Sequence, residues 1–185
     1  MKLFALSIAS IGLIALAISQ TSFSDSGEEG EHRFWQRTTG VMPVKNELYD
    51  KECGSCHFAY PPSLLPQRSW QAIMAGLDDH FGDNAELDSN DHQAISQDLL
   101  DNSAEKSGSR HSHKMLKGLS AATTPLRISE LPKFKREHNE VPKRVFKNNP
   151  DLKSLSQCAA CHRDAKQGYF SESRINIPGF GRWDD

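Results

Sequence analysis

The chain has 185 residues, of which 37% are hydrophobic and 8% aromatic, and its formal net charge is −2. A near-neutral total gives no reason to expect nucleic acid as a partner, because binding to phosphates needs an excess of lysine and arginine. The low apolar content predicts a thin core, since burial must offset the chain entropy lost on folding. Something besides side chains is therefore expected to fill part of the interior.

The first residues, 1–24, are typical of a secretory signal peptide. Lys2 precedes an apolar run from Leu3 to Ile18, and small polar residues follow it. The run is shorter than the ~20 residues of a membrane-spanning helix, and no stop-transfer cluster of charges comes after it. We expect export to the periplasm, cleavage near residues 24–26 and no stable membrane insertion. An uncleaved anchor is the alternative.

A short helix is predicted within residues 46–57, and it ends in a distinctive motif. Cys53 and Cys56 are separated by two residues, and His57 follows directly. The same pattern recurs about a hundred residues later. The second motif consists of Cys158, Cys161 and His162. Together the two motifs contain all four cysteines of the chain.

Covalent haem attachment explains this spacing better than the alternatives do. The two thiols of such a motif form thioethers with the porphyrin, and the adjacent imidazole binds the iron as proximal ligand. A disulfide within each cysteine pair, or a zinc site made by the thiolates, needs no histidine directly after the second cysteine. We therefore predict two haem c groups, with His57 and His162 as proximal ligands. Their apolar macrocycles would supply the missing core.

The next predicted element, after a proline-rich turn, is a helix over residues 69–82. Its apolar stripe has helical spacing and contains a histidine. The stripe consists of Trp70, Ile73, Met74, Leu77, His80 and Phe81. An imidazole facing apolar groups costs free energy unless it is paired. His80 is therefore a candidate for the second axial position of one iron, with Met74 as the alternative ligand.

Four further histidines are weaker candidates. His92 lies early in another predicted helix, where bulky apolar neighbours are few. His111 and His113 fall in a segment rich in serine, glycine and lysine, which is typical of a linker or loop. We expect residues 103–124 to form this linker and both histidines to be solvated. His32, in the polar segment 25–45, is expected to be exposed.

The second half of the chain repeats the association of a motif with an inward-facing histidine. Residues 129–142 predict a helix that begins near Pro132 and places His138 on the same face as Leu131 and Phe134. His138 is thus the candidate for the second iron. Another helix is predicted to start at residues 149–150 and to carry the second motif at its end. No strand is predicted, because the apolar alternation near the C-terminus is too short.

Charge is distributed unevenly along the chain. Residues 69–105 contain no lysine or arginine and nine acidic side chains, whereas residues 127–147 contain seven lysines and arginines against three glutamates. A chain with one acidic and one basic segment could orient itself towards a charged partner. The alternative is that both segments are ordinary solvated surface with no role in docking.

Several stretches, taken in order, resemble the periplasmic dihaem cytochrome c family. They are ECGSCHFAYPPSLLPQRSW, DDHFG, TPLRISELPKFKREHNEVP, CAACHRDAKQG and INIPGFGRW. The resemblance extends over nearly the whole chain from residue 46. It does not include the segment before residue 46 or the loop at 103–118.

The resemblance implies two haems ligated by histidine pairs, with His57 and His162 proximal and His80 and His138 distal. It also implies electron exchange with a small oxygen-binding monohaem cytochrome and with a membrane cytochrome b. Proximity in the chain pairs His57 with His80 and His162 with His138. We expect a mainly α fold with extensive loops, in which two small cytochrome c-like haem lobes, residues 46–102 and 125–185, share one chain.

These features predict a periplasmic electron carrier that acts by outer-sphere transfer and is not an enzyme. Two imidazoles leave no iron position free, and they stabilise the ferric state more than a thioether does, so low reduction potentials are expected. The alternatives are a small haem enzyme or a gas-binding protein, either of which needs one open iron.

Overall fold

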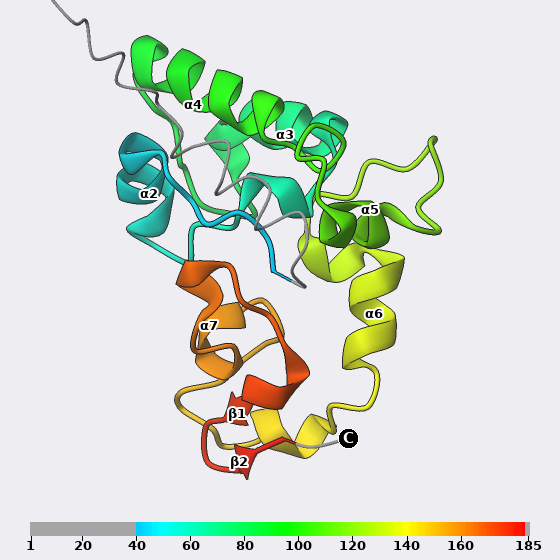
Figure 1. The fold of residues 1–185 in the computed structure, drawn as a ribbon. Coiled ribbons are helices and arrows are strands. Elements are labelled where there is room, and N and C mark those ends of the chain that lie inside the picture. The colour runs from blue at the N-terminus through cyan, green and yellow to red at the C-terminus, as the bar shows by residue number, and fades with distance from the viewer. Residues whose placement is uncertain (1–39, 184–185) are drawn as a thin grey trace, which may run out of the picture.

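A computed structural model describes residues 40–183. The predicted signal peptide, His32 and most of the polar segment 25–45 lie outside the described residues. The six α-helices of the described part are α2 (Glu47–Gly54), α3 (Gln67–Met74), α4 (Ser89–Asp101), α5 (Arg110–Leu116), α6 (Pro132–His138) and α7 (Cys158–Cys161). Short 3₁₀ turns and loops connect them, so the fold is mainly α with extensive loops, as predicted (Figure 1).

Side-chain caps explain where three of these helices begin. The Asn46 side chain accepts a hydrogen bond from the backbone N–H of Tyr49 at the start of α2. Asp88 accepts two backbone hydrogen bonds at the start of α4, and Ser109 does the same for α5. Each cap satisfies N–H groups that have no partner within their own helix.

The larger hydrophobic core lies among α2, α3, α4, α5 and α6. Its buried members include Trp70 from α3, Leu99 from α4, Met115 from α5 and Phe134 from α6. Figure 1 shows α3 and α4 side by side at one end of the molecule, with α6 leading away from them towards the C-terminal part. This core therefore contains residues from both sides of the expected linker.

The C-terminal part has a much smaller core and little regular structure. Its buried cluster consists of Val145, Leu152 and Ile177. Strands β1 (Asn176–Ile177) and β2 (Gly181–Arg182) pair antiparallel. They are too short to produce a visible alternation of apolar and polar residues, which is why the sequence analysis predicted no strand.

Two predicted helices are shorter than expected. The one placed at residues 69–82 begins at Gln67 and ends at Met74, and a 3₁₀ turn, Leu77–Asp79, follows it. The one placed at 129–142 spans only Pro132–His138. In the first case the chain leaves the helix at Ala75 and Gly76, and glycine is a poor helix former.

Two other local predictions were wrong. No helix starts at residues 149–150; the only helix at the second motif is the four-residue α7. Conversely, residues 110–116 form α5 where a loop was predicted. The Ser109 cap and the burial of Met115 against the larger core stabilise this short helix, and neither was visible as an apolar stripe. Within residues 40–183, no helix is long and apolar enough to cross a membrane.

Candidate haem sites

The structure brings the four predicted iron ligands together in two pairs. The ring centres of His57 and His80 are 6.1 Å apart, and their planes differ by 23°. The ring centres of His138 and His162 are 6.2 Å apart, with planes at 67°. These are the pairs expected from proximity in the chain.

Both separations suit one metal ion between two imidazoles. At metal–nitrogen bond lengths of about 2.0–2.1 Å, opposed imidazoles have ring centres roughly 6.3 Å apart, because each nitrogen lies about 1.1 Å from its ring centre. Direct contact between the rings would bring the centres closer, as it does for Phe134 and His138, which stack with centres 3.8 Å apart.

Backbone carbonyls orient one imidazole of each pair. Nδ1 of His57 donates to the carbonyl oxygen of Phe58 at 2.8 Å, and Nδ1 of His138 donates to that of Phe134 at 2.9 Å. Because a carbonyl can only accept, each Nδ1 carries the proton and each Nε2 keeps a lone pair. This is the usual arrangement of histidines that bind metals through Nε2.

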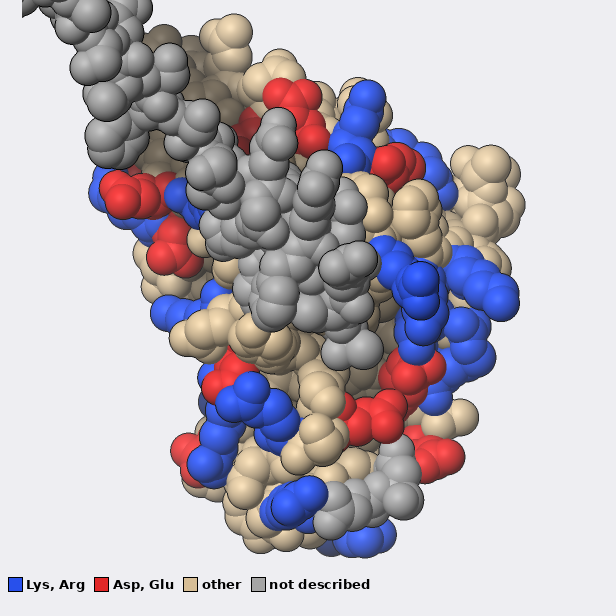
Figure 2. Space-filling model, viewed as in Figure 1, with Lys and Arg blue, Asp and Glu red and all other residues tan. Residues whose placement is uncertain are grey.

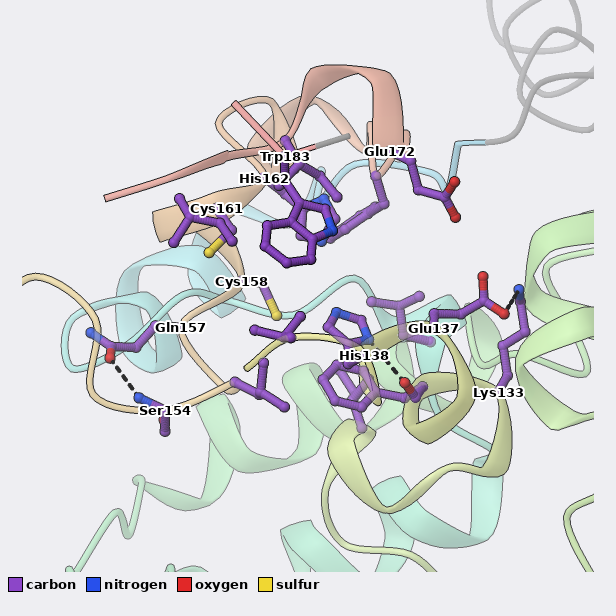
Figure 3. Close-up of a pocket in the computed structure, with 18 of the residues that line it drawn as sticks. Lys133, Glu137, His138, Ser154, Gln157, Cys158, Cys161, His162, Glu172 and Trp183 are labelled. Carbon is purple, nitrogen blue, oxygen red and sulfur yellow. Dashed lines mark hydrogen bonds and ion pairs between the residues drawn. The ribbon is translucent and has the colours of Figure 1, made fainter. Parts of the chain in front are cut away.

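A large cavity separates His138 from His162, and its space is about 1120 Å³ including the part open to solvent. Figure 3 shows the two imidazoles on opposite sides of this cavity, with the sulfurs of Cys158 and Cys161 beside it. Its apolar lining includes Met115, Phe134, Leu152, Phe170, Ile175 and Trp183. Lys133 and Glu137, which form an ion pair at 2.7 Å, are among its polar lining residues.

One buried atom indicates that this cavity holds a bound group. Nδ1 of His162 has no hydrogen-bond partner among the described residues. An unpaired buried ring nitrogen is costly. A cavity with an apolar lining, two thiols and two facing imidazoles fits a covalently attached haem, whose iron the two imidazoles would bind.

Burial also sets the protonation of these groups. It lowers the pKa of His162 to about 4, with nearby His138 adding to the effect, and it lowers the pKa of His80 and of His138. These three imidazoles are therefore neutral at neutral pH, the form that binds metals. Burial raises the pKa of the Cys53 and Cys158 thiols to about 11.

The geometry does not support the zinc or disulfide alternatives. No disulfide joins the cysteines of the described residues. Within residues 40–183, no cluster of three or more histidine, cysteine, aspartate or glutamate side chains could hold a metal ion.

The competing ligand candidates have other roles. Nε2 of His92 donates to the carbonyl oxygen of Met74 at 2.9 Å, which ties α4 to the end of α3. Met74 itself is buried in the larger core. His113 is exposed, as expected, but His111 is half-buried and lines the cavity between His138 and His162. The prediction that His111 is solvated was therefore wrong.

The structure adds contacts that the sequence analysis missed. Phe170 lies beside His162, with ring centres 5.4 Å apart, and Tyr60 lies beside His57 at 5.3 Å. Phe81 was placed on a helical stripe but adopts φ 59°, and the Arg127 guanidinium lies 3.8 Å from its ring centre. Phe81, Tyr60 and Phe170 lie in loops, so no periodicity marked them. Their only sequence signal is an aromatic residue close to a motif or to a ligand candidate.

Comparisons with known proteins agree with this site. A family model described as dihaem cytochrome c matches residues 49–170. A diheme cytochrome c from Rhodobacter sphaeroides is 46% identical, with a TM-score of 0.63, and the match covers 70% of this chain and 100% of that one. A diheme cytochrome type c from Shewanella baltica is 42% identical, with a TM-score of 0.63, over 76% of this chain and 99% of that one. No curated protein sequence matches the chain.

Proposed function

The chain belongs to the dihaem cytochrome c family, and from this premise we propose that it carries electrons between redox partners in the periplasm, with two histidines on each iron. The family implies two covalently bound haem c groups, which Cys53 with Cys56 and Cys158 with Cys161 would hold. The observation that carries the ligation is the separation of 6.1 and 6.2 Å between the paired imidazole rings. The signal peptide predicted for residues 1–24 supports the periplasmic location.

The residues of each site support a carrier more than a catalyst. When bound, each haem supplies one iron atom that changes between the ferric and ferrous states. The two imidazoles of each pair would both bind the iron, which would leave no position for a substrate. Imidazole favours the ferric state, and we expect both potentials to be low relative to carriers with one histidine and one methionine.

Carbon monoxide provides the test of this ligation. We expect the visible spectrum of the dithionite-reduced protein to stay unchanged when carbon monoxide is added, because no iron position is open. His80→Gly and His138→Gly are the positive controls, since each opens one iron and should shift part of the Soret band. A shift in the unmodified protein would contradict the proposal and would favour a haem enzyme or a gas-binding protein.

Redox partners are proposed from the charges on the surface. Lysine and arginine side chains gather over α5 and α6 (Figure 2). The exposed basic residues from α5 to residue 147 are Arg110, Lys114, Lys117, Arg127, Lys135, Arg136, Lys143, Arg144 and Lys147. This basic surface suits a partner with acidic groups around its own redox centre. On the family resemblance, we propose a small oxygen-binding monohaem cytochrome, and also a membrane cytochrome b.

Docking through this basic surface predicts a dependence on salt. We expect the rate of electron exchange with such a monohaem cytochrome to fall as ionic strength rises, because screening weakens the attraction. The double variant Lys135→Glu and Arg136→Glu should lower the rate at low salt and flatten its salt dependence. The control is the double variant Lys106→Glu and Lys166→Glu, which changes the net charge by the same amount at two lysines that are not part of this basic surface. Equal effects of the two double variants would argue against docking there.

A further inference from the structure

Tyr60 lies directly against the first haem site. It follows the first motif by three residues, in the loop between α2 and the next 3₁₀ turn. Its ring centre is 5.3 Å from that of His57, and the two planes differ by 31°. The Phe58 ring meets it edge-on at 5.5 Å. Tyr60 therefore packs beside the imidazole that serves as proximal ligand.

The other end of the same side chain reaches the segment that leads into the second motif. The Tyr60 hydroxyl donates to the carbonyl oxygen of Ser156 at 2.8 Å, although the two residues are 96 positions apart. Ser156 lies two residues before Cys158, the first thioether position of the second motif. One side chain thus contacts both motif regions, which the sequence separates by about a hundred residues.

The surroundings hold Tyr60 in place. The hydroxyl of Tyr49, whose side chain is only 2% exposed, donates to the backbone carbonyl of Tyr60 at 2.8 Å. The hydrogen bond from Tyr60 to Ser156 lies at the protein surface, and it restrains the distance between two segments that are far apart in the sequence.

We propose that Tyr60 is a positioning residue that sets the approach of the two haem sites and lies on the path between them. This inference rests on the proposed function, because it concerns electron exchange within the molecule. One electron leaves a ferrous centre and reaches a ferric one, while Tyr60 is neither oxidised nor deprotonated. Its ring and hydrogen bond keep the gap between His57 and the segment before Cys158 filled with packed atoms.

The experiment compares three variants of the haem-loaded protein in a half-reduced sample. Proton NMR exchange between haem methyl signals of the partly reduced states reports the rate of electron exchange between the sites. We expect Tyr60→Phe to slow this exchange and Tyr60→Ala, which also loses the ring, to slow it further, with the absorption spectrum unchanged. Tyr49→Phe is the comparison: it loses the hydrogen bond to the Tyr60 backbone but keeps the one from Tyr60 to Ser156, so it should slow the exchange less than Tyr60→Phe does.

A second readout covers the case in which Tyr60→Ala does not fold. For Tyr60→Phe, we expect amide hydrogen exchange across residues 154–160 to rise by about fivefold, the factor that one lost hydrogen bond gives. Unchanged inter-haem exchange and unchanged protection in Tyr60→Phe would overturn the inference. Carbon monoxide binding by the unmodified protein would instead contradict the proposed function, so the two failures are distinguishable.

Discussion

Replacing Cys158 and Cys161 by alanine is expected to unfold the C-terminal part of the chain, about residues 142–183, while α2 to α5 keep their structure. Without the thioether bonds, the cavity between His138 and His162 would lose the haem expected to fill it. Only Val145, Leu152 and Ile177 form the buried cluster there. We expect the free energy of unfolding of this part to fall by more than the ~2–5 kcal/mol that truncation of a single buried side chain costs.

Hydrogen exchange followed peptide by peptide measures this local unfolding. Cys53→Ala with Cys56→Ala serves as the comparison, because the first motif adjoins the larger core among α2, α3 and α4. That double variant should retain protection in residues 142–183. Native protection of this region in the variant lacking Cys158 and Cys161 would show that side chains alone stabilise it.

Replacing Gly168 by alanine is expected to destabilise the folded protein by at least about 2 kcal/mol. Gly168 has φ +79°, a conformation that costs a residue with a Cβ about 1–2 kcal/mol. A Cβ at this position would also lie 2.0 Å from the carbonyl oxygen of Val41, so backbone must move. That movement disturbs the hydrogen bond from Val41 N–H to the Gly168 carbonyl, 2.9 Å long, and the fully buried Val41 side chain.

Gly181 provides the matched control. It has φ +85°, and a Cβ there would meet nothing within 4 Å. Gly181→Ala should therefore lower the free energy of unfolding only by the about 1–2 kcal/mol that a positive φ costs a residue with a Cβ. Denaturant unfolding of both haem-loaded variants gives the two free energies of unfolding. Equal losses would mean that the close approach of Val41 to Gly168 contributes nothing to stability.

Local patterns predicted the chemistry of the sites better than the lengths of the helices. His138 was recognised from apolar spacing within a helix, and the observed α6 does end at that residue. His80 was chosen by the same reasoning, yet it follows a 3₁₀ turn beyond the end of α3. An apolar stripe reports which side chains face inward, but it does not report where the backbone leaves the helix.

Contacts between distant segments could not be predicted in this way. The hydrogen bond of Tyr60 to Ser156 and the approach of Val41 to Gly168 each join residues about a hundred positions or more apart. Likewise, α5 depends on packing of Met115 against the larger core, and the surrounding sequence resembles a loop. Propensity is a weak guide wherever tertiary packing supplies most of the stability of a short helix.

The sequence by itself determined the attachment chemistry and the membership of the chain in its family. Two cysteines and a histidine at fixed spacing are a local requirement of covalent haem binding, so they can be recognised without a fold. Only the tertiary structure decided how far apart the paired imidazole rings lie, which aromatic side chains lie beside them and which side chain joins the two motif regions. Those relations depend on contacts across the whole chain, whose free energy comes from burial and close packing rather than from any local pattern.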